Sequence, residues 1–422
     1  MRSKKLTIGL FGFGVVGEGI YKVLRDTPSL EAAIKKVCIK HPEKIRDAPA
    51  AIFTTHAEEL LNDPTINLIV ELIDNSEEAF VIVSEALRRR KAVVSANKKM
   101  IAEHFTQLRH LQNEYGTALL YEAAVCVSIP VIRNLEEYYD NDLLKSICGV
   151  VNGSTNFILT RIIDDKLTYA EALRLAQQAG FAESNPALDV NGIDAANKLS
   201  ILLLHGYGLR VAPGELLCKG ITSIHADDAT FSGEKGYRIR LCARAFKLAN
   251  GTVGAFVLPH FVTTESQLYN VVNEYNGVVI ETGLADKQFL FGKGAGRYPT
   301  SSAVLSDIAA LRYDYRYEYR KLSMMKQRDG VGAADDFYLR VYVSFNDWSI
   351  VNRDAFAWID EFHGTGDRQY ICGVIHYRTL RDAEWFHFKD VSVIVLPDGI
   401  AEPSVTDSRA IQQKSLRLAG IY

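Results

Sequence analysis

The chain has 422 residues, of which 48% are hydrophobic and 23% charged, so it is long enough for two or three domains with sizeable cores. Its formal net charge of −3 argues against a nucleic-acid-binding protein. No apolar run reaches the roughly 18 residues of a transmembrane helix. Met1–Lys5 leads directly into an apolar run, so we expect no signal peptide and a cytoplasmic location.

Alternating strand and helix signals fill residues 1–130 and predict an α/β domain with a doubly wound parallel sheet of the Rossmann type. The expected strands are 6–11, 37–39, 68–72, 92–95 and 118–121. The expected helices are 17–25, 58–62, 77–90 and 103–115.

A glycine-rich turn follows the first expected strand. It reads Gly12-Phe13-Gly14-Val15-Val16-Gly17 and leads into a helical pattern. Gly-x-Gly-x-x-Gly between a strand and a helix is the fingerprint of a dinucleotide site, where the pyrophosphate lies at the helix N-terminus. The alternative is a glycine turn without a ligand. The position at the start of a βαβ pattern favours the dinucleotide.

The end of the second expected strand bears on the choice of cofactor. An NAD site usually has an acidic residue there, which binds the ribose 2′-hydroxyl. This chain has Lys40 instead, with Lys44 and Arg46 close behind. Basic residues suit a 2′-phosphate, so NADP is favoured, with NAD as the alternative. The alternative explanation of these basic residues is a solvated loop that binds no phosphate.

Residues 131–300 change to helices followed by strands, which predicts an α+β substrate-binding and dimerisation domain. We expect helices at 156–163, 169–179 and 192–205, and strands at 237–248, 252–258, 277–282 and 287–291. Arg238, Arg240 and Arg244 alternate along one of these strands and predict a sheet face exposed to solvent or to a second subunit, rather than a phosphate-binding patch. A further helix at 303–311 precedes a tyrosine-rich stretch, 312–328, which we interpret as a linker or solvated rim. Strand signals at 337–345, 371–377 and 391–396 then predict a small α+β domain over 331–422.

Three carboxylates and a lysine gather near the start of an apolar helix. Asp194 and Lys198 are four residues apart and share a helix face, while Glu183 and Asp189 lie in the preceding loop. Such charges beside an apolar surface fit a polar substrate. An ordinary surface ion pair, contributing about 0.3–0.5 kcal/mol, is the alternative.

Six cysteines are spread over the chain without any Cys-x-x-Cys pair. Several lie in apolar, strand-like segments, so we interpret them as buried thiols of a reducing cytoplasm rather than as a disulfide framework or metal site. They are Cys38, Cys126, Cys148, Cys218, Cys242 and Cys372.

From residue 6 to about 311, the chain resembles the homoserine dehydrogenase family. The resemblance rests on the glycine turn, the acid–lysine segment and further motifs in the same order. These are Ser95–Lys99, Tyr121–Pro130, Val151–Leu159, close to the family's Asn-Gly-Thr-Thr-Asn-Tyr-Ile-Leu, and Gly294–Val304. The chain departs from the family pattern at Cys126–Ser128, where glycines are usual, at Asp74–Asn75, where Gly-Gly is usual, and at Asn185, where Asp is common.

This resemblance implies reversible, NAD(P)-dependent reduction of L-aspartate 4-semialdehyde to L-homoserine in threonine, methionine and isoleucine biosynthesis. Lys198 would move a proton at the substrate oxygen, Asp194 would be its partner, and Lys98 would be a second lysine at the hydride-transfer site. Glu183 and Asp189 would bind the substrate ammonium group. Asn152, Thr155 and Asn156 would line the site, and Asn97 with Lys98 would contact the cofactor.

The family also implies a homodimer or higher homo-oligomer, and in some members a sodium ion. The sodium ligands would be the backbone carbonyls of Glu122, Val125, Val127 and Ile129, a site that the Cys126–Ser128 replacement puts in question. A helix near 300–315 would return to the first domain, and the tail would be an ACT-like regulatory domain that is dispensable for chemistry. The alternatives are another small amino-acid dehydrogenase and a catalytically silent, amino-acid-sensing relative.

Overall fold

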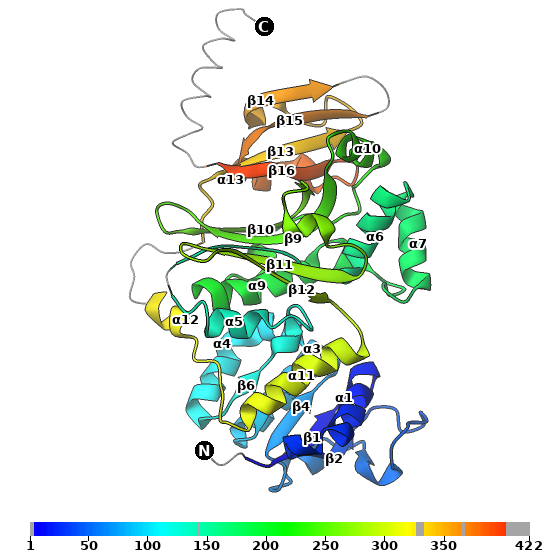
Figure 1. The fold of residues 1–422 in the computed structure, drawn as a ribbon, viewed down its shortest axis with the longest axis vertical. Helices are drawn as coiled ribbons and strands as arrows, with labels where there is room; N and C mark the ends of the chain where they lie inside the picture. The colour runs from blue at the N-terminus through cyan, green and yellow to red at the C-terminus, as the bar shows by residue number, and fades with distance from the viewer. Residues whose placement is uncertain (1–3, 142, 326–332, 364–367, 402–422) are drawn as a thin grey trace, which may run out of the picture. The chain divides into compact units, whose positions relative to one another are not determined.

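The computed structural model describes residues 4–141, 143–325, 333–363 and 368–401. It divides into two compact units, each with its own β-sheet (Figure 1). The first unit comprises Met1–Asn141, Ser200–Ala212 and Gly292–Met324, and the second comprises Asp142–Leu199, Pro213–Phe291 and Met325–Tyr422. The boundary falls inside one helix, α9 (Ile193–Tyr207), which therefore contributes residues to both units.

The first unit contains a six-stranded, all-parallel sheet of order β3-β2-β1-β4-β5-β6. This is the doubly wound order of dinucleotide-binding sheets, so the predicted fold class is confirmed. The strands are β1 (Leu6–Phe11), β2 (Ala32–Cys38), β3 (Phe53–Thr54), β4 (Leu68–Glu71), β5 (Ala92–Ser95) and β6 (Leu119–Leu120). The helices are α1 (Val15–Asp26), α2 (Glu58–Leu61), α3 (Ser76–Arg88), α4 (Lys98–Tyr115), α5 (Val131–Glu136), α11 (Arg297–Leu311) and α12 (Arg320–Met325).

The carboxyl ends of the central strands lead directly into helix N-termini. Asn75 caps α3 by accepting a hydrogen bond from Glu78 N, and Asn97 caps α4 by accepting one from Met100 N. Because these caps satisfy otherwise unpaired N–H groups, they fix where the helices begin. Both helix starts therefore lie at the sheet edge where ligands of doubly wound proteins bind.

The second unit contains a mixed sheet of order β12-β11-β7-β9-β10-β16-β13-β15-β14, with β8 beside β10. The strands are β7 (Leu144–Val150), β8 (Leu217–Cys218), β9 (Arg238–Lys247), β10 (Val253–Val262), β11 (Tyr275–Thr282), β12 (Asp286–Lys293), β13 (Tyr338–Phe345), β14 (Phe356–His363), β15 (Gln369–His376) and β16 (Ser392–Ala401). Besides α9, its helices are α6 (Gly153–Asp164), α7 (Tyr169–Gln178), α8 (Ala187–Val190), α10 (Ala226–Glu234) and α13 (Tyr377–Asp382).

The C-terminal strands share a core with the middle of the chain. Phe246, Phe256 and Leu258 belong to the same buried cluster as Phe337 and Val341. Strand β16 lies between β10 and β13, so the last described strand continues the sheet that the middle segment begins. The expected strands 337–345, 371–377 and 391–396 are present, whereas β14 was missed. The expected three-domain division itself stays a prediction.

A buried carboxylate, Asp228 on α10, also connects the middle of the chain to the C-terminal strands β13 and β16. It accepts hydrogen bonds from the hydroxyls of Tyr342 (3.0 Å), Ser344 (2.6 Å) and Ser392 (2.7 Å). A fully buried acid is costly unless its lone pairs are satisfied. The three donors come from β13 and β16, so the tail supplies most of what makes Asp228 tolerable there.

Two expectations about exposure were wrong. Arg240, expected on an exposed sheet face, is fully buried, because its guanidinium donates to the backbone carbonyls of Leu268 and Tyr269. Tyr317 and Tyr319, expected on a solvated rim, are 3% and 5% exposed because they pack against Tyr121 and Phe105. Residues 326–328 of the expected linker lie outside the described residues.

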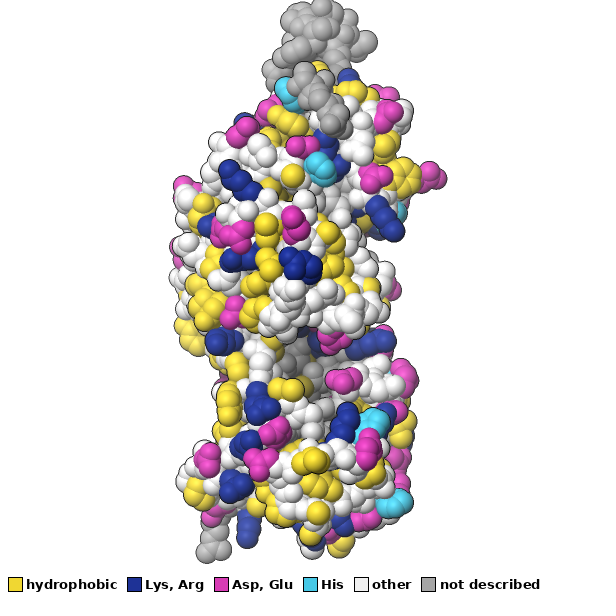
Figure 2. All heavy atoms as spheres, turned by 90° about the vertical axis from the view of Figure 1, so that its right-hand side faces the viewer, with side chains coloured by type: hydrophobic (Ala, Val, Ile, Leu, Met, Phe, Trp, Pro, Cys, Tyr) yellow, Lys and Arg dark blue, Asp and Glu magenta, His cyan; other side chains and the backbone are white. Residues whose placement is uncertain are grey.

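Within the described part of the chain, no helix is long and apolar enough to cross a membrane. On the face drawn in Figure 2, Lys and Arg side chains lie interspersed with Asp and Glu side chains, as the net charge of −3 suggests.

Candidate active site

The glycine turn of the first unit has the geometry that its sequence predicts. Gly12 has φ +92°, and a Cβ there would lie 2.7 Å from the carbonyl oxygen of Leu72. A Cβ on Gly17 would lie 2.3 Å from the carbonyl oxygen of Gly12. By contrast, a Cβ on Gly14 would meet no described atom within 4 Å, so this face of the turn is open. Since Gly14 directly precedes α1, a pyrophosphate could approach the helix N-terminus here.

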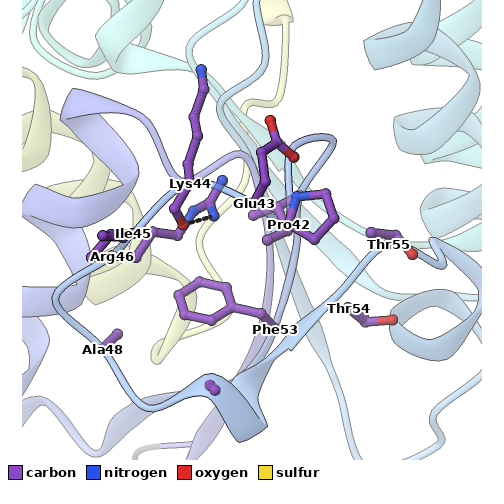
Figure 3. A pocket seen from close by; sticks show the side chains of 11 residues that line it. Pro42, Glu43, Lys44, Ile45, Arg46, Ala48, Phe53, Thr54 and Thr55 are labelled. Atoms are coloured by element: carbon purple, nitrogen blue, oxygen red, sulfur yellow. Dashed lines mark hydrogen bonds between the residues drawn. The ribbon is translucent and has the colours of Figure 1, made fainter.

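The loop after β2 forms a surface pocket together with β3 (Figure 3). Arg46 turns back onto the loop, donating to the carbonyls of Lys44 (2.6 Å) and His41 (2.7 Å), and its guanidinium lies 5.5 Å from the Phe53 ring centroid. The same ring packs edge-on against Phe13 of the glycine turn. Lys44 extends away from the Phe53 ring (Figure 3). This pocket can offer a flat apolar ring and basic groups to one end of a nucleotide.

Lys40, the expected 2′-phosphate ligand, is already paired. Its ammonium nitrogen lies 2.5 Å from a carboxylate oxygen of Glu78 in the first turn of α3. Both side chains are substantially exposed, so the pair is of the weak surface kind. A phosphate at this position would therefore compete with Glu78 for Lys40.

The second unit brings most of the acid–lysine segment together. Lys198 Nζ lies 2.8 Å from Asp194 Oδ2 and 2.6 Å from the carbonyl oxygen of Val151. The amide nitrogen of Asn152 bridges the two acids, at 2.7 Å from Asp189 Oδ1 and 2.8 Å from Asp194 Oδ2. Lys198, Asp194 and Asn152 are each only 5–6% exposed. This is a fixed charged cluster and not a solvated surface pair.

Asn152 owes its position to the start of α6. It is the N-cap of that helix, and its side-chain oxygen accepts from Thr155 N at 2.8 Å, which leaves its amide nitrogen pointing at the carboxylates. Thr155 also donates its hydroxyl to Asn152. Asn156 faces elsewhere, since its amide donates to the carbonyls of Val271 and Tyr275.

Glu183 lies outside the bridged group. It is exposed, and the hydrogen bond recorded there runs from Gln177 to its backbone carbonyl. Sequence spacing placed Glu183 and Asp189 in one loop, but Asp189 lies in the short helix α8, and spacing along the chain does not determine which carboxylates converge. In the first unit, Lys98 is half-buried as the first residue of α4.

The segment with the expected sodium ligands lies in the first unit around the 3₁₀ turn Glu122–Ala124. Val127 has φ +53°, a conformation that is strained for a β-branched residue and typical of the glycines usual in the family. The carbonyl of Ile129 already accepts from Val131 N, and the carboxylate of Glu122 accepts from Ile132 N and Arg133 N. Two of the oxygens of this segment, the Ile129 carbonyl and the Glu122 carboxylate, therefore already have hydrogen-bond donors within the protein.

Sequence reasoning missed three buried carboxyls in the first unit. Burial raises the pKa of Glu71 to about 7 and that of Asp307 to about 7. Burial, together with the nearby Asp307, raises the pKa of Glu122 to about 8. The available signal was a single acid inside an apolar run, as in Leu68-Ile-Val-Glu71-Leu72.

The doubly wound sheet with an open glycine turn, together with a buried lysine–carboxylate cluster, defines a nucleotide-dependent oxidoreductase. Family models sharpen this assignment: the model described as homoserine dehydrogenase, NAD binding domain, matches residues 12–122, and the homoserine dehydrogenase model matches residues 130–309.

Individual relatives agree. The homoserine dehydrogenase of Bacillus subtilis is 35% identical over 322 residues, covering 74% of either chain. That of Lactococcus lactis is 32% identical over 400 residues, 92% of this chain and 87% of its own. A homoserine dehydrogenase structure from Thiobacillus denitrificans matches with a TM-score of 0.80 at 25% identity, covering 94% of this chain and 99% of its own. A hyperthermophilic archaeal homoserine dehydrogenase in complex with NADPH matches with a TM-score of 0.64 at 26% identity, covering 74% and 99%.

The chain therefore belongs to the homoserine dehydrogenase family. It is an NAD(P)-dependent oxidoreductase of amino-acid biosynthesis, as the resemblance of its motifs predicted.

Proposed function

We propose that the chain interconverts L-homoserine and L-aspartate 4-semialdehyde with NADP as its preferred cofactor, using Lys198 to move the proton at the substrate oxygen. The buried contact between Lys198 and Asp194 carries the proposal, because it presents an oriented ammonium group in a water-poor site. A nicotinamide cofactor held at the glycine turn would supply or accept the hydride. Lys198 then gives a proton to the oxygen that gains negative charge, or takes it back in the reverse direction.

The other groups of the cluster would bind the substrate and orient the Lys198 ammonium group. Asp194 and the carbonyl of Val151 hold the Lys198 ammonium, and the Asn152 amide donates to both Asp189 and Asp194, which offsets part of the repulsion between them. Asp189 on α8, which is less buried, would bind the substrate ammonium group, with Glu183, in the segment that precedes α8, as a second acid and Thr155 supporting Asn152. Lys98 would serve at the hydride-transfer site together with the cofactor loop at Asn97.

The NADP preference is supported by the basic loop Lys40–Arg46 and by a relative whose structure is in complex with NADPH. Glycines 12, 14 and 17, with Phe13, Val15 and Val16, would form the pyrophosphate turn. A sodium ion at the carbonyls of Glu122, Val125, Val127 and Ile129 stays part of the proposal. Equal activity in sodium, potassium and N-methylglucamine salts would remove it.

The assembly, the location and the tail are also proposals. We propose a homodimer, which light scattering would test, and a cytoplasmic location, which the biosynthetic family and the free thiols of the described residues support. The strand order β16-β13-β15-β14 supports an ACT-like tail, since it is the order of a split β-α-β fold. Between β13 and β14, however, the described chain has the short turn Arg353–Ala355 in place of a helix. Inhibition assays with threonine, methionine and isoleucine test this assignment.

A steady-state assay tests the central proposal. Homoserine oxidation should proceed with both cofactors and with a higher kcat/KM for NADP. Equal kcat/KM values would reject the cofactor preference, and no turnover of homoserine with either cofactor would reject the reaction.

A further inference from the structure

Glu71 is a buried acid at the carboxyl end of β4, in the middle of the first unit's sheet. It pairs with Phe11 on β1 and with Ser95 on β5, and it is 0% exposed. All other residues of β4 are apolar. An acid in such a place is costly unless its oxygens are satisfied, so its retention needs an explanation beyond packing.

Glu71 joins the loops that follow two neighbouring strands. One carboxylate oxygen accepts from Ile73 N at 2.7 Å, in the loop after β4. The other accepts from the hydroxyl of Ser95 at 2.5 Å, at the end of β5. Ser95 in turn accepts from Asn97 N at 3.0 Å, and the Asn97 amide donates to Ile73 O at 3.2 Å. These four contacts close a ring through both loops.

We propose that Glu71 is a positioning residue that locks the loop after β4 to the loop after β5 and thereby fixes Asn97 and Lys98 at the start of α4. One member of the ring, Asn97, directly precedes Lys98. Another, Ile73, lies two residues before Asn75, the N-cap of α3. Both helix starts lie at the ligand-binding edge of the sheet. The inference rests on the proposed function, in which Asn97 and Lys98 serve the cofactor and hydride transfer.

The charge of Glu71 gives a second readout. Burial, assisted by the nearby Asp74, raises its pKa to about 7, while the hydrogen bonds from Ser95 and Ile73 oppose this rise. The group therefore changes charge near neutrality. A glutamine in its place cannot ionise, but its oxygen can still accept from Ile73 N, and its amide can donate to Ser95.

Hydrogen exchange of the ligand-free full chain tests the lock itself. Glu71→Ala and Ser95→Ala should each speed amide exchange in both loops, residues 72–75 and 96–101, whereas Glu71→Gln should restore most protection. Glu114→Gln, an exposed acid on α4, is the matched control and should change neither loop. Faster exchange confined to the loop that carries the substitution would overturn the lock, and Ser95→Ala decides this point even if Glu71→Ala does not fold.

Turnover of homoserine with NADP tests the consequence. Corrected for the folded fraction, kcat of Glu71→Ala and Ser95→Ala should fall about tenfold or more, because small misplacements at a reacting centre are expensive. Glu71→Gln should keep kcat within about threefold, and its pH profile should lose the contribution that the ionisation of Glu71 makes near pH 7. Wild-type kcat in both alanine variants would overturn the positioning role. A wild-type protein that binds NADP but does not oxidise homoserine would instead reject the proposed function. The exchange data would still show whether Glu71 couples the two loops.

Discussion

Lys198 Nζ lies 2.8 Å from Asp194 Oδ2, one helical turn away, with both side chains less than a tenth exposed. Neither charge can be removed alone without leaving the other buried and less well compensated. Removing one partner of this buried pair should therefore cost more stability than removing one partner of the surface ion pair that the sequence spacing also allowed.

Replacing Lys198 with alanine should lower kcat by about 10² or more, the usual scale for a lost general acid or base. The exposed Lys389→Ala is the matched control and should leave kcat unchanged. Steady-state kinetics on variants verified as folded by circular dichroism measure the effect. A Lys198→Ala enzyme with near-normal kcat would reject the proton-transfer role.

Asn152→Asp should destabilise the chain more at pH 8 than at pH 5. The new carboxylate would face Asp189 and Asp194 at the present hydrogen-bond distances of 2.7 and 2.8 Å. Repulsion raises carboxyl pKa values in the folded state, so stability is lost as the pH rises through them. Urea denaturation at both pH values measures the difference, and Asn152→Ala is the control because it removes the bridge without adding charge. Equal losses for Asn152→Asp at the two pH values would contradict the prediction.

The free energy of unfolding of the wild type should carry a term that falls as the pH rises from about 5 to 8. Glu122 and Asp307 have folded-state pKa values raised to about 8 and about 7, from ordinary values of 4.5 and 3.8. The folded chain thus holds protons that the unfolded chain has released, which corresponds to at most about 1.4 kcal/mol per pH unit and proton.

Glu122→Gln should flatten this slope, since it removes one of the three buried carboxyls with raised pKa values, the others being Asp307 and Glu71. Chemical denaturation at pH 6, 7 and 8 gives the slopes directly. An unchanged slope in the variant would show that Glu122 is already ionised at neutral pH.

Glu78→Gln should improve NADP binding. It frees Lys40 from a surface pair, and such pairs contribute at most about 1 kcal/mol, so KM for NADP should fall by up to about fivefold. KM for NAD, which has no 2′-phosphate, should stay the same. If the two KM values change together, Lys40 does not discriminate between the cofactors.

A chain that ends near residue 328 should be poorly soluble. The cut would uncover Phe246, Phe256 and Leu258 and would strip Asp228 of the hydroxyl donors from β13 and β16. Size-exclusion chromatography of the truncated chain measures this, and a monodisperse, folded product would contradict it.

Sequence patterns predicted the first unit well because its signals are local. β1 and β5 have the expected bounds, and the glycine turn lies where the fingerprint placed it. A helix such as α2 (Glu58–Leu61) can be recognised from its own residues, without knowledge of the segments that pack against it. By contrast, β16 was recognised as a strand, but nothing in its residues indicates that it lies between β10 and β13.

The same limit applies to the site. The residue types of the acid–lysine segment predicted a polar site, but only the fold shows that Asn152, 42 residues before Asp194, holds two of its carboxylates. Likewise, the alternation of Arg238, Arg240 and Arg244 places them on one sheet face. It cannot reveal that the carbonyls of Leu268 and Tyr269 cover Arg240.

The place of β16 also bears on synthesis. A ribosome makes this strand last among those described, yet it sits inside the sheet, with β10 and β13 on either side. The first unit's six strands are complete by residue 120. By contrast, β10 and β13 cannot pair with β16 until residues 392–401 have been synthesised. Until then the edges of β10 and β13 that β16 will cover are unpaired in the nascent chain. Such edges are prone to aggregation, so this is the stage at which chaperone binding protects the chain most.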